Sequence, residues 1–593
     1  MTALLDALRA ADAVADRFLR GKQIPGVAYG FVAGGGDAGG ALVHSRGIGT
    51  LRVGEAAVPD ADSVFRIASM TKSFTAATIL TLRDEGRLSL DDPIARHVPE
   101  LAGLRGPTAD SPPITVRHLM TMSSGLATDD PWGDRQQGLD LVAFSELLGG
   151  QFTFAWATGT RFEYSNLGYG ILGRMITNVA GAEYKDVVRE RMLRPLGMSS
   201  TGYLAEEVPP ARLAHGYVWR DGAYVEEPMD SYGALAAMGG VFTSVRDLGR
   251  WVAFLADAFP PRDDPDPERT LSRASRREMQ QASTAWRPSV TQTGLDADPA
   301  VSGGGYGFGL FVEDDLRWGR IVRHGGGYPG FGSNMRWHPA SGLGVIVLAN
   351  HRYAPATALA AELMASLLAA DVVPVRRIRP TPAMDAARAD VERLLGAWDD
   401  NLASGLFAMN VELDEPLDRR RAALAVLRKT HGVVRADPHE NPESETPLHL
   451  SWWLVGHRGG RVRVTILLAP EDPPRVQTLT VTSVLEPSRK LRAAAESIVT
   501  RVNAPAPTLP AGLALGPDVD RDALERAFRI AGARYAPVDL GRVEACEGAS
   551  SATWRLSGPH GELMLTVDLD PASGAINSLV LVPRFPSPPA HAD

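Results

Sequence analysis

The segment Ala68-Ser69-Met70-Thr71-Lys72-Ser73-Phe74 joins a short β-like run, Val64 to Ile67, to a helix-favouring run, Met70 to Leu82. A serine and a lysine three residues apart lie on the same side of a helix, one turn apart. The first free N–H groups of such a helix, and the positive end of its dipole, point at whatever the serine attacks. The segment therefore predicts a nucleophile, a proton acceptor and an anion-stabilising group within one turn of chain.

Length and composition narrow the classes of protein that fit this chain. Its 593 residues exceed the size of one hydrophobic core, so we expect about two to four domains. A net charge of -9 without a basic stripe argues against nucleic acid as a partner. The single cysteine, Cys546, excludes an internal disulfide framework and a cysteine-based metal site.

The N-terminal residues argue against export and membrane insertion. Asp6 and Asp12 interrupt the apolar core that a signal peptide needs. No apolar run reaches the length of about 18 residues that spans a bilayer. We therefore expect a cytoplasmic protein without a membrane partner.

Helical and alternating hydrophobic patterns follow one another along the first 375 residues. Helices are expected over 3–20, 70–82, 171–179, 245–255 and 354–370, with another that begins at a Thr115 cap. Strands are expected over 26–32, 41–45, 306–311, 321–327, 333–338 and 344–350. The glycine-rich loop 34–40 has no Gly-Lys-Ser/Thr and no helix after it, so we interpret it as a hairpin connection. These elements predict an α+β fold in which helices flank an antiparallel sheet and an all-helical lobe is inserted.

An internal repeat occupies the C-terminal third. A helix at 418–429 is followed by Trp453 and by strands at 461–466 and 476–481. The same order returns about 100 residues later, with Trp554 in the place of Trp453. We expect domains at 1–375, 376–490 and 491–593, the last two being smaller α+β repeat units with a structural or regulatory role.

Three motifs follow one another along the chain, Ser69-Met70-Thr71-Lys72, Tyr164-Ser165-Asn166 and His324-Gly325-Gly326. Together, in this order, they resemble the serine β-lactamase and penicillin-binding-protein superfamily. The branch with class C β-lactamases, family VIII esterases and D-aminopeptidases looks most similar. The resemblance covers roughly residues 10–370 and implies the β-lactamase/transpeptidase-like fold for that part.

The resemblance also implies roles for the residues of these motifs. Ser69 would be acylated, and the ammonium of Lys72 would hold Tyr164 partly as phenolate. Either of these two groups can then accept the serine proton, and the pair titrates as a coupled system. Asn166 would orient the substrate amide or the lysine.

The third motif departs from the β-lactamase pattern, which has Lys-Thr-Gly on that strand. His324 takes the place of the lysine that holds a substrate carboxylate, and a histidine is mostly neutral at pH 7. This departure favours ester or amide substrates over β-lactams. Gly325, Gly326 and Gly327 permit close backbone approach, and the N–H groups of Gly327 and Ser69 would form the oxyanion hole.

The predicted function is therefore that of a serine hydrolase acting on small esters, amides or peptides. The alternatives are a penicillin-binding-protein-type thioesterase or acyltransferase, a weak β-lactamase, and a binding protein with a vestigial Ser69 site. The chain has neither a Gly-x-Ser-x-Gly elbow nor a His-Glu-x-x-His zinc motif. The predicted chemistry needs no cofactor and no metal. The sequence does not fix the oligomeric state.

Overall fold

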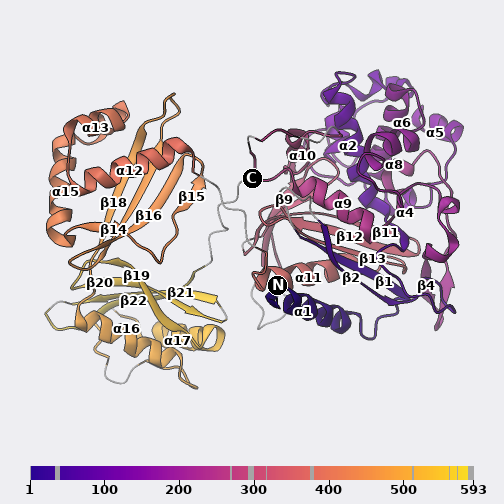
Figure 1. Cartoon of the computed structure of the whole chain (residues 1–593). Helices are drawn as coiled ribbons and strands as arrows, with labels where there is room; N and C mark the ends of the chain where they lie inside the picture. The colour runs from indigo at the N-terminus through magenta and orange to yellow at the C-terminus, as the bar shows by residue number, and fades with distance from the viewer. Residues whose placement is uncertain are drawn as a thin grey trace. The chain divides into compact units, whose positions relative to one another are not determined.

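The computed structural model describes residues 2–33, 41–262, 264–266, 270–291, 300–315, 317–373, 380–509, 513–517, 519–559, 561–570 and 572–584. The chain divides into two compact units, here called unit 1 (residues 1–376) and unit 2 (residues 377–591). Both units combine helices with antiparallel sheets (Figure 1). The α+β class predicted from the sequence is confirmed.

Unit 1 is built on a nine-stranded antiparallel sheet whose strands follow the order β2-β1-β13-β12-β11-β10-β9-β7, with β8 paired to β9. The bounds are β1 Gly26–Ala33, β2 Ala41–Gly49, β7 Thr284–Ala285, β8 Ser289–Thr291, β9 Ala300–Tyr306, β10 Phe311–Asp315, β11 Gly319–Tyr328, β12 Phe331–His338 and β13 Leu343–Ala349. β1 pairs with β13 on one side and with the edge strand β2 on the other, so the first strand of unit 1 lies beside its last strand near one edge of the sheet. Residues 34–40, the predicted hairpin loop, lie outside the described residues.

Helices cover both faces of this sheet because successive strand residues point to opposite sides. Val27, Tyr29 and Phe31 pack with α1 (Thr2–Leu19) and α11 (Ala356–Ala369). Ala28 and Val32 face the other way, into the core that includes α9 (Val245–Ala256). The period-2 pattern of β1 thus places the sheet between two helical layers.

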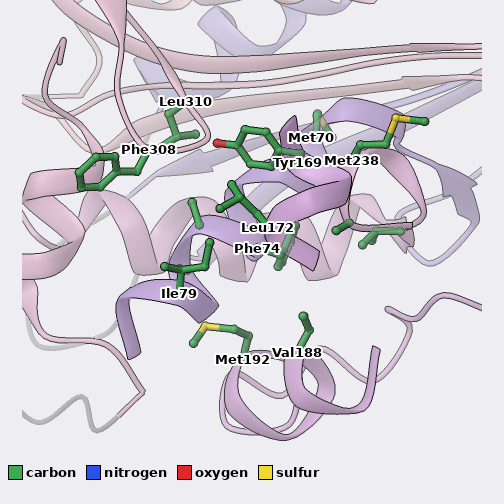
Figure 2. Close-up of a cluster of buried hydrophobic side chains, with 14 of the residues drawn as sticks. Met70, Phe74, Ile79, Tyr169, Leu172, Val188, Met192, Met238, Phe308 and Leu310 are labelled. Carbon is green, nitrogen blue, oxygen red and sulfur yellow. The ribbon is translucent and has the colours of Figure 1, made fainter. Parts of the chain in front are cut away.

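The helical lobe is organised around α2 (Thr71–Asp84), whose residues are buried from Thr71 to Leu82. Phe74 of α2 stacks on Trp251 of α9, with ring centroids 4.2 Å apart. Figure 2 shows Met70, Phe74 and Ile79 packed among side chains of α6 (Asn166–Ala180), α8 (Ala236–Gly239) and the chain around Met192. Since α2 contacts both the sheet layer and the lobe, any group on its first turn has a fixed position.

Four shorter helices complete the lobe: α3 Val116–Met120, α4 Asp130–Gly133, α5 Leu141–Leu148 and α7 Tyr184–Val188. The predicted cap of α3 is present, because the Thr115 hydroxyl accepts from the backbone N–H of His118 and the His118 ring accepts from that of Thr115. A further helix, α10, runs over Arg273–Met279.

The predicted strand over 306–311 is wrong. Tyr306 ends β9 and Phe311 begins β10, and the two residues are paired across a bend. Gly309 in this bend has a φ of +69°, and a Cβ there would lie 2.5 Å from the carbonyl oxygen of Lys72. The alternation of Gly and aromatic residues in 306–311 therefore reflects a tight turn pressed against α2, not an extended strand.

Unit 2 contains two antiparallel sheets, each with helices packed on it (Figure 1). The first half comprises α12 Pro382–Gly396, α13 Asp400–Leu406, α14 Met409–Asp414, α15 Leu417–His431, β14 Val434–Ala436, β15 Glu443–Thr446, β16 His449–Gly456, β17 Arg461–Leu468 and β18 Val476–Val484. The second half comprises α16 Arg489–Val502, α17 Arg521–Tyr535, β19 Asp539–Cys546, β20 Ser551–Gly558, β21 Gly561–Leu569 and β22 Ile576–Arg584. We propose a domain boundary near residue 490, because one hydrophobic core runs from Met384 to Val476 and the other from Val484 to Leu579.

The tryptophan equivalence drawn from the sequence is wrong by one residue. Trp452 of β16 and Trp554 of β20 are the buried pair, each in the core of its own half. Trp453 points to the opposite face of β16, where it packs against the core of the second half and under the guanidinium of Arg461, 4.1 Å from the ring centroid. Adjacent strand residues face opposite ways, so a one-residue slip exchanges the inner for the outer side chain.

Within the described residues, no helix combines the length and the apolar composition that a membrane crossing requires.

Candidate active site

The chain reaches Ser69 through a sharp change of direction. β3 (Val64–Arg66) pairs with β6 (Phe242–Ser244), and a short 3-10 turn, η1 (Ala68–Met70), leads into α2. Ala68 has a φ of +50°, a conformation that is costly for a residue with a Cβ. This strained residue turns the chain so that the partly exposed Ser69 projects beside the first turn of α2.

The three side chains predicted to carry the chemistry are in contact. The Lys72 Nζ lies 3.0 Å from the Ser69 Oγ. The Ser69 hydroxyl acts on the Tyr164 phenol by lowering its pKa, and the Lys72 Nζ lies 4.9 Å from the centroid of the Tyr164 ring. The nucleophile predicted from the sequence therefore has both predicted proton acceptors beside it.

The fully buried amine of Lys72 has three hydrogen-bond partners. Besides the Ser69 Oγ, it donates to the Asn166 Oδ1 at 2.7 Å and to the Met238 carbonyl oxygen at 2.8 Å. An ammonium satisfies all three acceptors with its three N–H groups. A neutral amine has two N–H groups, which the two carbonyl oxygens occupy, so its lone pair faces the Ser69 hydroxyl.

Asn166 is the first residue of α6, and Ser165 caps that helix by accepting from the N–H of Gly168. Through its Oδ1, Asn166 contacts the lysine rather than an open surface, and it is 1% exposed. Of the two roles expected for Asn166, we therefore propose orientation of the lysine.

His324 lies on β11, 1% exposed, with both ring nitrogens engaged inside the protein. Its Nδ1 lies 2.6 Å from the Gly325 carbonyl oxygen, so this nitrogen carries the proton. Its Nε2 accepts from the hydroxyl of Tyr306 at 3.0 Å. Burial and the nearby Lys72 lower the pKa of His324 to about 3, so the ring is neutral. We propose that His324 shapes the site and does not bind a substrate carboxylate.

The glycines of β11 allow the strand to lie against the chain that precedes Ser69. A Cβ at Gly326 would lie 2.1 Å from the Ile67 carbonyl oxygen, and one at Gly327 would lie 2.5 Å from the ring of Tyr353. Ser333 on β12 donates to the same Ile67 oxygen at 2.8 Å. This close approach brings the backbone of Gly325 to Gly327 beside η1, as expected for strands that supply an oxyanion donor.

Burial acts in opposite directions on the two candidate bases. Desolvation lowers the pKa of Lys72 to about 8, although nearby carboxylates, Asp130 first, partly offset it. Desolvation and the charge of Asp130 raise the pKa of Tyr164 well above its usual range. The phenolate form of Tyr164 is therefore disfavoured, and the neutral form of Lys72 is accessible near pH 8.

The sequence analysis missed a group of carboxylates beside the site. Asp129, Asp130 and Asp134 all act on the pKa of Lys72, and burial raises the pKa of Asp134 itself to about 6. The Asp134 Oδ2 accepts from the Tyr353 hydroxyl at 2.6 Å. In the sequence, these carboxylates are visible only as an Asp-Asp-Pro run typical of a helix start. Nothing in that run indicates that α4 contacts α6.

Aromatic side chains line the other side of Tyr164. Phe311 is stacked against Tyr164, with centroids 6.3 Å apart, and lies 4.9 Å from Tyr306. Phe162 and Trp286 extend this group, and both are partly exposed. The site thus has an acidic side at α4 and an aromatic side at β9 and β10.

Among the residues that the structure describes, no three His, Cys, Asp or Glu side chains are arranged to hold a metal ion.

A family model named Beta-lactamase matches residues 11–369. The chain belongs to the beta-lactamase family. The resemblance drawn from the three motifs is thereby confirmed, and the relatives in this family are hydrolases. The match covers unit 1 and ends before unit 2.

Individual relatives share this beta-lactamase domain. The D-alanyl-D-alanine-carboxypeptidase/endopeptidase AmpH of Escherichia coli K12 is 29% identical over 315 residues, which cover 51% of this chain and 75% of AmpH. Protein flp of Staphylococcus aureus MW2 is 26% identical over 349 residues, covering 58% of this chain and 63% of flp, so the match spans less than two thirds of flp.

A solved structure matches most of the chain. The octameric penicillin-binding protein homologue from Pyrococcus abyssi superposes with a TM-score of 0.51 at 18% identity, covering 95% of this chain and 96% of that one. At this identity, the likeness is evidence for the fold alone and not for a shared activity or assembly.

The close approach of β11 to η1 can be tested with alanine at Gly326. Because the Cβ would meet backbone at Ile67, we expect G326A to push β11 away, to cost about 1–3 kcal/mol of stability and to slow covalent labelling of Ser69 at least about tenfold. Labelling by a fluorophosphonate and thermal unfolding measure the two effects. The matched control is G303A on β9, where a Cβ meets nothing within 4 Å. If G326A labelled Ser69 at the wild-type rate, the close approach of β11 to η1 would not matter for the site.

Proposed function

We propose that the protein is a serine hydrolase that forms an acyl-enzyme on Ser69 and hydrolyses small esters, amides or peptides. The contact of the Lys72 Nζ with the Ser69 Oγ, with both remaining amine hydrogens directed at carbonyl oxygens, carries this proposal. Membership of the beta-lactamase family supports it. A binding protein would not need a buried lysine whose lone pair faces a serine.

In the first step, the neutral amine of Lys72 accepts the proton of Ser69 while the Oγ attacks the substrate carbonyl carbon. The oxygen of the resulting tetrahedral intermediate is stabilised by the N–H groups of Ser69 and Gly327. Tyr164, which is still protonated at this point, donates its proton to the leaving group and takes one from the Lys72 ammonium. Alcohol or amine departs, and the acyl group stays on Ser69.

In the second step, water takes the place of the leaving group. The neutral amine of Lys72, with the hydroxyl of Tyr164 beside it, accepts a proton from the water as its oxygen attacks the ester. Collapse of the second intermediate returns the proton to the Ser69 Oγ and releases the carboxylic acid. Each proton that leaves a group is returned to it, so the enzyme is regenerated without a cofactor.

Covalent labelling tests the nucleophile. A fluorophosphonate probe should label the wild-type chain once, at Ser69, and leave S69A unlabelled. K72A and Y164F should label about a hundredfold more slowly or worse, since each removes a proton carrier. The matched control is S199A, which alters the exposed serine of Gly197–Thr201. Undiminished labelling of S69A would refute the proposed function.

The pH dependence tests the base. Because burial lowers the pKa of Lys72 to about 8, the reactive neutral amine increases as pH rises through that value. The labelling rate should therefore rise between about pH 7 and pH 9 and then level off. Stopped-flow labelling of the wild-type protein across this pH range measures the rise in rate. A rise centred near pH 6 would instead point to a base other than Lys72.

The charges around the site bear on the substrate class. The groups that act on both Lys72 and Tyr164 include the carboxylates Asp130 and Asp134. Arg323, the cation next to His324 on β11, is bound to Glu313 with an Nε–Oε1 distance of 2.7 Å. We therefore propose acyl donors that carry no carboxylate near the scissile bond, unlike a β-lactam or the C-terminus that a carboxypeptidase removes.

Matched esters test this charge preference. We expect p-nitrophenyl acetate to be hydrolysed with a kcat/KM at least about tenfold above that of p-nitrophenyl hemisuccinate, whose extra carboxylate is repelled. Added salt should narrow the difference, because it screens partly exposed charges. The uncatalysed hydrolysis rates of the two esters serve as the reference. A preference for the hemisuccinate would rule out the proposed substrate class.

A further inference from the structure

Two adjacent carboxylates where the short helix α4 begins bind the first residues of α6. The two Asp129 oxygens accept from the backbone N–H groups of Asn166 and Leu167, each at 2.7 Å. The Asp130 Oδ1 accepts from the Asn166 Nδ2 at 2.6 Å. Gly133 makes room for this contact, because a Cβ there would lie 3.0 Å from the Asn166 Cβ. We call Asp129 and Asp130 the α4 clamp.

The clamp decides which way the Asn166 amide faces. The amide has an acceptor end and a donor end, and the two ends meet Lys72 and Asp130. In the observed orientation, the oxygen faces the amine and the NH2 group faces the carboxylate. In the reversed orientation, the amide NH2 group would face the N–H groups of Lys72, and the amide oxygen would face the Asp130 carboxylate. Donor would meet donor at one end and acceptor would meet acceptor at the other, which is unfavourable at both ends. Of the two partners of the amide, Asp130 is the one that accepts from its NH2 group.

Resting on the proposed function, we propose that Asp130 is a positioning residue that acts through Asn166: by fixing the amide it aims the lone pair of the Lys72 amine at the Ser69 hydroxyl. Without it, the amide can turn its NH2 group toward the lysine. The lone pair of the amine would then have an alternative donor to accept from, and Ser69 would lose its base.

The charge of Asp130 has a second effect, on the pH at which Lys72 is neutral. The titratable groups that face Lys72 come from α4 and the residues on either side of it, from the chain before α6 and its first turn, and from β11: Asp129, Asp130, Asp134, Tyr164, Tyr169 and His324. Of the carboxylates, Asp130 raises the lysine pKa most. Removing its charge should therefore lower that pKa and move the rising limb of acylation to lower pH.

Two substitutions separate these effects in the full-length chain. D130N removes the charge but keeps an oxygen that accepts from Asn166, whereas D130A removes both. The matched control is D110N, which alters a fully exposed carboxylate. Fluorophosphonate labelling rates from pH 6 to pH 10 are one readout. The other is the titration of 13Cε-labelled lysine by NMR, which suits a chain with five lysines and does not depend on activity.

We expect D130A to lose about 10- to 100-fold in the labelling rate at high pH, and D130N to lose less. In D130N, the rising limb and the Lys72 resonance should both shift by about one unit to lower pH. An unshifted Lys72 titration in D130N, or a D130A rate equal to that of wild type, would overturn the inference while Ser69 labelling stands. If the wild-type protein is not labelled but the Lys72 titration still shifts in D130N, the proposed function alone would be overturned.

Discussion

The buried amine of Lys72 is the constraint on which the rest of unit 1 depends. A lysine amine removed from water is costly unless its hydrogens find acceptors and its charge finds partners. Here the acceptors come from three separate segments, through the Ser69 Oγ, the Asn166 Oδ1 and the Met238 carbonyl oxygen. Each must arrive at the correct place, so the packing of α2, α6 and α8 sets the geometry of the proposed site.

The two layers around α2 meet this constraint in different ways. On the sheet side, glycines remove side chains at two close approaches: Gly326 of β11 lies against Ile67, just before η1, and Gly309 of the β9–β10 bend lies against Lys72 of α2. On the lobe side, large apolar groups such as Phe74 and Tyr169 fill the space (Figure 2). Close backbone contact on one side and dense side-chain packing on the other hold the first turn of α2, with Ser69 and Lys72, in place.

Electrostatic asymmetry gives this site a character that the family alone does not specify. His324 is neutral and the residues at α4 are carboxylates, so these two sides of the site do not attract anions. The same carboxylates keep the lysine pKa from falling as far as burial alone would take it. We propose that this one acidic side both serves the proposed base and disfavours acyl donors that carry a carboxylate. All residues of the proposed site belong to unit 1, and unit 2 repeats a sheet-and-helix plan with cores of its own.

The sequence by itself determined the α+β class and the family, and it contained the motifs of the proposed site, because these rest on local periodicity and on residues close in sequence, such as Ser69 and Lys72. It also gave most strand positions, but it placed a strand over 306–311, where contact with α2 requires a bend. Only the tertiary structure decided that His324 is turned inward onto Tyr306 and that Asp130 reaches Asn166. Those contacts join segments 18 and 36 residues apart, and no local pattern encodes which side chains meet when separate elements pack together.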